Sequence, residues 1–258
     1  MALWYQPLNV ATRTQRPLKL VFTAYKWIVV APTLAFSTII LGALIIVVSA
    51  LGAPNLASRV FATAWARLNS AVSIMSVRHK GMENLDPSRS YVVVSNHQSL
   101  YDIYVLYGFL GVDFKWIMKR ELRSVPVLGM ACAAMGHIMI DRSNTKAALE
   151  SINGARSRIV DGMSVVFFPE GTRSRNGELK AFKNGAFRFA LEMGLPILPV
   201  VIHGTKDILP SDTVDLRPGQ ATIEILPAIE TTGLSAETFT ELSDQVHDQI
   251  GLALNQRS

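Results

Sequence analysis

From Gly81 onward the chain alternates short apolar runs with longer stretches in which apolar residues recur at helical spacing. The short runs are rich in β-branched residues and carry few charges, which is typical of strands buried on both faces. Strands that alternate with helices indicate an α/β fold with a mostly parallel central sheet flanked by helices. The predicted strands cover residues 90–95, 114–118, 137–141, 164–168, 197–203 and 221–226, and the predicted helices cover residues 99–110, 125–134, 145–161, 180–193 and 235–254.

A different pattern precedes this region. Residues 27–58 contain no charged side chain, and as a helix residues 27–51 would run roughly 37 Å, more than the roughly 30 Å of a bilayer core. Residues 59–77 follow with apolar residues at helical spacing and polar ones between them. Together the two segments predict an N-terminal two-helix membrane anchor within residues 1–77, followed by an α/β domain in residues 78–258. A cleaved signal peptide has a shorter apolar part, and a buried core helix has a polar face, so both explain the first segment less well.

The charges around these segments predict their orientation. Both flanks are basic, and the positive-inside tendency places both on the cytoplasmic side of a membrane. This favours a hairpin or a pair of helices in the membrane plane over a single crossing, and the depth of insertion stays open. The flanking residues are Arg13, Arg16, Lys19 and Lys26 before the segments, and Arg78 and Lys80 after them.

Composition narrows the class of protein. A chain of 258 residues can bury one substantial core, and 49% hydrophobic residues suggests contact with a membrane. The net charge of +5 favours anionic partners such as lipid phosphates, an acidic carrier protein or nucleic acid, and does not choose among them. Cys132 is the single cysteine of the sequence, which excludes an intrachain disulfide and any cysteine-based zinc site.

The most informative stretch is Tyr91-Val-Val-Val-Ser-Asn-His97-Gln-Ser-Leu-Tyr-Asp102, where a buried strand ends in a polar turn. The carboxyl ends of strands in α/β sheets are where ligands and catalytic groups collect. If a helix begins just after His97, the carboxylate of Asp102 folds back and accepts a hydrogen bond from the imidazole. This arrangement is that of a general base. The alternative is a histidine at the end of a strand beside an exposed aspartate, and the pair alone favours neither.

A second buried strand, residues 164–168, ends in the polar turn Pro169-Glu-Gly-Thr-Arg-Ser174. Arg173 projects from this tight turn, and the planar guanidinium of arginine suits a phosphate. Further cations follow the turn, so the region could hold a phosphate monoester; the alternative is a solvated basic loop. Lys119 follows a short apolar run in the same way and is a second candidate for a phosphate contact.

Four blocks of the sequence, in order, resemble those of the glycerolipid acyltransferases. Asn96-His97-Gln-Ser-Leu-Tyr-Asp102 is similar to their His-x4-Asp box, and Lys119-x-Glu-Leu-x3-Pro-x2-Gly129 is similar to their second block. Phe168-Pro-Glu-Gly-Thr-Arg-Ser174 and Leu195-Pro-Ile-Leu-Pro-Val200 resemble the third and fourth. The blocks cover residues 80–205, and four in order are far more specific than a lone His-x4-Asp.

Within this family the likeness is greatest to the bacterial enzymes that acylate 1-acyl-sn-glycerol 3-phosphate (lysophosphatidic acid). The resemblance implies transfer of a fatty acyl group from acyl-CoA or acyl carrier protein to the sn-2 hydroxyl, which gives phosphatidic acid for phospholipid biosynthesis. It also implies a protein associated with the inner membrane of a bacterium. The sequence has no P-loop and no His-Glu-x2-His zinc motif, so no metal or other cofactor is expected. The implied catalytic residues are His97 and Asp102, and the implied substrate-binding residues are Lys119, Glu170, Gly171, Thr172 and Arg173.

Two other interpretations stay open. The acceptor could be another lysolipid or glycerol 3-phosphate, since Arg173 and Lys119 favour a phosphate monoester without selecting one. A protein of a different class, a non-catalytic membrane protein that binds anionic lipid, would use the same basic loops without needing a histidine and carboxylate pair. Nucleic-acid binding is the least favoured, because the cations lie in strand-end loops without interleaved stacking aromatic residues.

Overall fold

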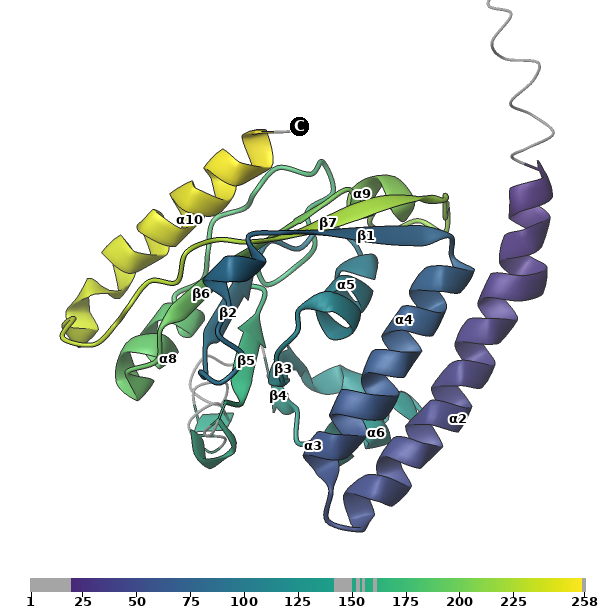
Figure 1. Ribbon diagram of the computed structural model, residues 1–258, viewed down its shortest axis with the longest axis horizontal. Coiled ribbons are helices and arrows are strands. Elements are labelled where there is room, and N and C mark those ends of the chain that lie inside the picture. Colours follow the sequence, from purple (N-terminus) through teal and green to yellow (C-terminus); the bar gives the residue numbers. More distant parts are fainter. Residues whose placement is uncertain (1–19, 142–149, 152–153, 155, 160–161, 257–258) are drawn as a thin grey trace, which may run out of the picture.

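The computed structural model describes residues 20–141, 150–151, 154, 156–159 and 162–256. Within them, one seven-stranded sheet has the strand order β1-β7-β6-β2-β5-β3-β4 (Figure 1). All neighbouring strands are parallel except β6 and β7, which are antiparallel. The strands are β1 (Met75–Lys80), β2 (Val92–Ser95), β3 (Phe114–Lys119), β4 (Ile138–Ile140), β5 (Ser164–Phe167), β6 (Ile197–His203) and β7 (Gly219–Ile225).

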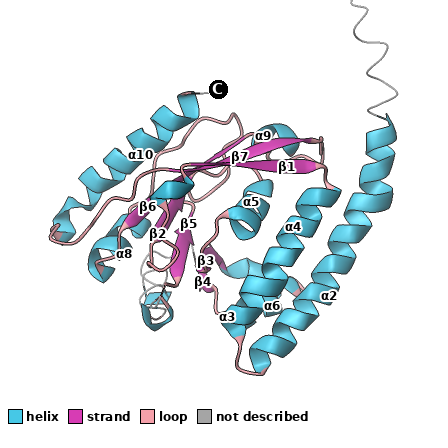
Figure 2. Cartoon of the chain, viewed as in Figure 1, coloured by secondary structure: helices cyan, strands magenta, loops and turns pink. Residues whose placement is uncertain are grey.

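Helices cover both faces of the sheet (Figure 2). One face packs through residues such as Val93 and Leu198 against α4 and α5, and the other packs through Val92 and Val165 against α8 and α10. This confirms the predicted α/β fold with a mostly parallel central sheet. The α-helices are α2 (Ala31–Ala50), α3 (Pro54–Ala57), α4 (Thr63–Val72), α5 (Tyr101–Phe109), α6 (Leu128–Ala134), α8 (Gly185–Met193), α9 (Thr205–Ile208) and α10 (Phe239–Asn255).

The six predicted strands are all present, and β1 is an additional strand that was not predicted. The predicted helix over 59–77 ends earlier, because α4 stops at Val72 and the backbone turns at Ile74, where φ is 55°. β1 then pairs with β7 at the edge of the sheet and joins the N-terminal helices to it. Most of the predicted helix over 145–161 lies outside the described residues.

The N-terminal region contains a long apolar helix. Leu20–Ala50 is helical throughout and contains an 18-residue window with a mean hydropathy of 2.4, of which 17% is buried, so by length and composition it could cross a membrane. Among the described residues it is the one helix of this kind. The second predicted anchor segment, residues 59–77, is divided into most of a π-helical turn (Ser58–Ala62), α4 and the start of β1. α4 packs on α5, where Arg67 Nε donates to Gly108 O at 2.8 Å. The prediction of two anchoring helices is therefore not confirmed.

Candidate active site

The loops that carry the candidate residues follow neighbouring strands. β2 lies between β5 and β6 in the sheet and is parallel to both, so the loops after these three strands emerge at the same edge. Asn96 fixes the start of the loop after β2, because its side-chain amide donates to Ile202 O at 2.9 Å and accepts from Ile202 N at 2.8 Å. Since Ile202 belongs to β6, the amide continues the pairing of the sheet beyond the end of β2.

His97 and Asp102 are in direct contact, as the turn between β2 and α5 requires. His97 Nδ1 lies 2.8 Å from Asp102 Oδ2. The aspartate is fully buried in the first turn of α5, and the histidine side chain is 14% exposed. With a proton on Nδ1 donated to the carboxylate, the lone pair of Nε2 is available for a substrate.

Three further groups of the protein donate hydrogen bonds to the Asp102 carboxylate. The backbone amides of Gln98 and Ser99 donate to Oδ2 at 2.7 and 2.9 Å, and the Thr205 hydroxyl donates to Oδ1. These bonds fix the carboxylate and therefore the imidazole that it orients. Thr205 was not predicted as a site residue, because it is 103 residues away from Asp102. Thr205 follows Gly204, directly after the end of β6, and β6 was itself predicted. Its position at the carboxyl end of a central strand could therefore have marked it as a candidate site residue.

The ring of Phe168 packs against the flat face of the His97 imidazole. The two ring centroids are 3.9 Å apart and the ring planes meet at 9°. Phe168 also stacks on Trp116, with a distance of 5.5 Å between the ring centroids. A flat ring pressed on the imidazole restricts its rotation, and its π face would stabilise a positive charge on the histidine. Phe168 was quoted in the third sequence block, but its ring contact with His97 was not predicted.

Glu170 joins the two loops. Its Oε1 accepts from the His97 backbone amide at 2.7 Å, and its Oε2 accepts from the Lys180 backbone amide at 3.2 Å. The side chain is buried, and this burial raises the pKa of the carboxyl group, although the two amide hydrogen bonds act in the opposite direction. The amides of Lys180 and Lys183 both bond to the Pro169–Glu170 turn, which is why α8 begins at Gly185 and not at residue 180 as predicted.

We expect the Glu170→Gln variant to reveal this pKa shift as a difference in the pH dependence of stability. The folded protein holds the Glu170 proton to a higher pH than the unfolded chain does. Above the usual carboxyl pKa of about 4.3 and up to the raised value, wild-type stability should therefore fall relative to the variant as the pH rises, by at most about 1.4 kcal/mol per pH unit. Urea unfolding of both proteins across this range measures the difference. Two parallel stability curves would contradict the expectation.

Arg173 and its neighbours form a basic surface on the same loop. Arg173 Nη2 lies 3.2 Å from Asp212 Oδ1, and Arg175 Nε lies 2.7 Å from Asp212 Oδ2. Lys180 Nζ donates to the Thr172 hydroxyl at 3.1 Å and to Arg173 O at 2.6 Å. The loop is held beside the histidine, because the Ser174 amide (N–H) donates to His97 O at 2.7 Å.

Gly171 allows the tight turn of this loop. Its φ is 75°, a left-handed conformation that suits glycine, and an added Cβ would lie 2.9 Å from Lys183 Cε. Lys119 lies elsewhere, at the end of β3, where its exposed ammonium pairs with Glu121 at 3.0 Å. Hydrogen bonds therefore bring His97, Glu170 and the Arg173 loop together, and in the described part of the chain no such bond joins Lys119 to them.

Two further observations concern groups that other catalytic chemistries use. Cys132 is buried in α6, and burial raises the pKa of its thiol to about 11, which disfavours the nucleophilic thiolate. Within the described ranges, no three His, Cys, Asp or Glu side chains gather where they could hold a metal ion.

Comparison with known proteins finds one family. Residues 76–203 match the acyltransferase family model. The chain is 36% identical over 171 residues to a human 1-acyl-sn-glycerol-3-phosphate acyltransferase alpha, covering 66% of this chain and 60% of the relative. It is 39% identical over 151 residues to a 1-acyl-sn-glycerol-3-phosphate acyltransferase of Chlamydomonas reinhardtii, covering 58% of this chain and 45% of the relative. The chain thus spans about half the length of these relatives.

A solved structure shares the fold over almost the whole chain. The crystal structure of the 1-acyl-sn-glycerophosphate (LPA) acyltransferase PlsC from Thermotoga maritima superimposes with a TM-score of 0.74 and 26% sequence identity. The match covers 93% of this chain and 96% of the other. The similarity therefore includes regions outside residues 76–203, on both sides of the family match.

Proposed function

Because the chain belongs to the acyltransferase family, we propose that it transfers a fatty acyl group from an acyl thioester to the sn-2 hydroxyl of 1-acyl-sn-glycerol 3-phosphate, giving phosphatidic acid. The observation that supports the proposal most directly is the 2.8 Å hydrogen bond between His97 Nδ1 and Asp102 Oδ2, beside a basic loop. A protein that only binds anionic lipid needs the cations. It has no use for a histidine oriented by a buried carboxylate.

In the proposed reaction His97 acts first as a base and then as an acid. Its Nε2 takes the proton of the acceptor hydroxyl while the hydroxyl oxygen attacks the thioester carbonyl carbon. The new C–O bond forms, the C–S bond breaks, and the imidazolium gives its proton to the departing thiolate. Asp102 and the face of Phe168 stabilise the imidazolium between these steps. Because the acceptor hydroxyl attacks the thioester directly, the reaction needs no acyl-enzyme intermediate.

The acceptor's phosphate is assigned to the Arg173 loop. Arg173 offers a planar fork to a phosphate and is 27% exposed, while the Glu170 bonds keep its loop against His97. Arg173 Nη2 donates to Asp212 Oδ1 in this structure, so a bound phosphate would replace Asp212 as the acceptor of that hydrogen bond. Gly171 and Thr172 shape the same turn, and Lys119 adds a positive charge at the end of β3.

The membrane and the donor complete the proposal. Helix Leu20–Ala50 would associate with a membrane, with residues 1–77 as the anchoring part and 78–258 as the acyltransferase domain. The site would face the cytoplasm of a bacterium at its inner membrane, where acyl-CoA or acyl carrier protein supplies the thioester. The net charge of +5 suits an acidic carrier protein, and no nucleic acid or cofactor is required.

The test is to supply purified full-length protein in detergent micelles with 1-acyl-sn-glycerol 3-phosphate and either acyl-CoA or acyl carrier protein thioester. Mass spectrometry of the lipid product should identify phosphatidic acid. Parallel reactions with glycerol 3-phosphate and with lysolipids that carry a phosphodiester headgroup test the acceptor. Product from one of these and none from 1-acyl-sn-glycerol 3-phosphate would move the assignment to that acceptor. No acylated lipid in any reaction would favour the binding protein.

A further inference from the structure

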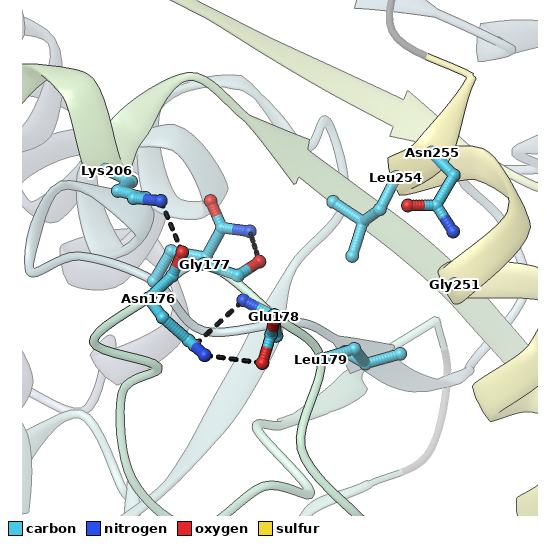
Figure 3. A pocket seen from close by; sticks show the side chains of 9 residues that line it. Asn176, Gly177, Glu178, Leu179, Lys206, Gly251, Leu254 and Asn255 are labelled. Carbon is cyan, nitrogen blue, oxygen red and sulfur yellow. Dashed lines mark hydrogen bonds between the residues drawn. The ribbon is translucent and has the colours of Figure 1, made fainter.

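A pocket of about 430 Å³ lies beside the His97 loop, and the reaction proposed above assigns it no role (Figure 3). Its wall is formed by Gln98, which follows His97 directly, by residues 176–179 after β5, by Lys206 of α9 and by the last turns of α10. The Gln98 side chain reaches across to the loop and donates from Nε2 to Gly177 O at 3.3 Å. The pocket therefore adjoins the residue that carries the proposed base.

The α10 wall of the pocket lies on the sheet face away from the apolar helix, whereas α9, which carries Lys206, packs with α5 on the other face. α10 packs on the sheet face that carries Val92 and Val94, whereas α4 and α5 pack on the opposite face. Figure 1 shows α10 and α2 at opposite ends of the molecule. An acceptor lipid held in a membrane would approach the His97 loop from the side of α2. The α10 wall of the pocket is consequently on the side from which a substrate arrives from water.

The side chains of the pocket suit a neutral chain that carries amide groups. Three of them are carboxamides, which both donate and accept hydrogen bonds; Asn176 and the Nε2 of Gln98 already bond within the wall, whereas the Gln98 oxygen and the exposed Asn255 face the pocket's opening or its rim. Two more are leucines, on which aliphatic segments pack. Amide groups separated by short aliphatic segments are the chemistry of a pantetheine arm. That arm is common to acyl-CoA and to acyl carrier protein. The carboxamides are Gln98, Asn176 and Asn255, and the leucines are Leu179 and Leu254.

The same pocket does not favour a phosphate. Glu178 contributes a carboxylate to the wall, and the carboxyl end of α10 adds the partial negative charge of a helix C-terminus. The Lys206 ammonium, the cation of this wall, already donates to Asn176 O. These negative groups would repel an anionic headgroup but not a neutral amide chain.

We propose that this pocket holds the pantetheine arm of the acyl donor, so that the thioester reaches His97 from the side opposite the apolar helix. The inference rests on the proposed acyl transfer and adds to it the binding site of one substrate. Donor and acceptor then approach the histidine from two sides, and neither has to leave before the other binds.

Gly251 of α10 offers a clean test. It lines the pocket, and an added Cβ would meet only Leu179 Cδ2 at 3.9 Å, an ordinary contact, so Gly251→Ala leaves the helix intact. Gly251→Phe places a ring in the pocket. We expect it to raise the KM for the thioester at least about tenfold. The KM for the lysolipid should stay within about twofold of wild type. Leu252→Phe is the matched control, because Leu252 is 63% exposed on the same helix.

Both acyl-CoA and acyl carrier protein thioester are measured, together with the thermal stability of each variant. A raised KM for both donors supports the pantetheine arm. A raised KM for acyl-CoA alone would overturn it in favour of a nucleotide site, and a raised KM for the lysolipid would overturn it in favour of a headgroup site. If Gly251→Phe does not fold, Asn255→Ala at the exposed end of α10 takes its place, with the same donor-specific rise expected and unchanged kinetics overturning the inference. Wild-type protein without activity would defeat the proposed function itself, which is a separate result.

Discussion

His97→Ala should lower the rate of acyl transfer by about 10²–10⁴, the contribution of a positioned general base, while the protein still folds and binds vesicles. The histidine side chain is 14% exposed, and its imidazole bonds to Asp102, so its removal takes away the base without opening the buried core. Initial rates with saturating 1-acyl-sn-glycerol 3-phosphate and thioester measure the loss, and flotation with vesicles that contain anionic phospholipid measures membrane binding.

His79→Ala is the matched control. His79 is an exposed histidine of β1, and its Nε2 contacts Phe109 O at 3.2 Å, away from the candidate site. It should retain wild-type kinetics. Near-normal turnover in His97→Ala would remove the base from the mechanism and favour the interpretation of the chain as a lipid-binding protein.

Sequence patterns predicted the parts of the fold that depend on local composition. The buried strands β2 and β5 are short β-branched runs, and such runs have few alternatives to a central position in a sheet. β1 was not predicted, because it lacks such a run. It lies at the edge of the sheet, and its sequence Met75-Ser-Val-Arg-His-Lys80 is mostly polar, so nothing in its pattern distinguishes it from the end of the preceding helix.

The candidate site divides in the same way. His97 and Asp102 lie five residues apart, so a single turn decides whether they meet, and the sequence was sufficient to predict that turn. Glu170 and Arg173 were found as members of a motif, but their partners were not. Asp212, the partner of Arg173, lies 39 residues away in the sequence. The Lys180 backbone amide, predicted to lie in a helix, instead donates a hydrogen bond to Glu170. Contacts between separate loops depend on the whole fold, and the spacing of residues along the chain does not predict them.

Arg173→Ala should raise the KM for 1-acyl-sn-glycerol 3-phosphate about 10- to 100-fold, since a hydrogen bond to a charged group contributes about 1.5–3 kcal/mol and each 1.4 kcal/mol is tenfold. The KM for the thioester should not change, because the donor carries no phosphate into this loop. Arg173→Lys should recover part of the loss, as a lysine keeps the charge but not the planar fork. Initial rates with each substrate varied in turn separate the two constants.

Arg217→Ala is the control for a general loss of positive charge. Arg217 pairs with Asp215 on the chain segment that also carries Asp212, and its side chain is 59% exposed, so it matches Arg173 in charge and in having an aspartate partner. Its replacement should leave both KM values unchanged. If Arg173→Ala raised the KM for donor and acceptor equally, the loop would act on the orientation of His97 through the Ser174 and Glu170 bonds, and the acceptor's phosphate would have to be assigned to another cation.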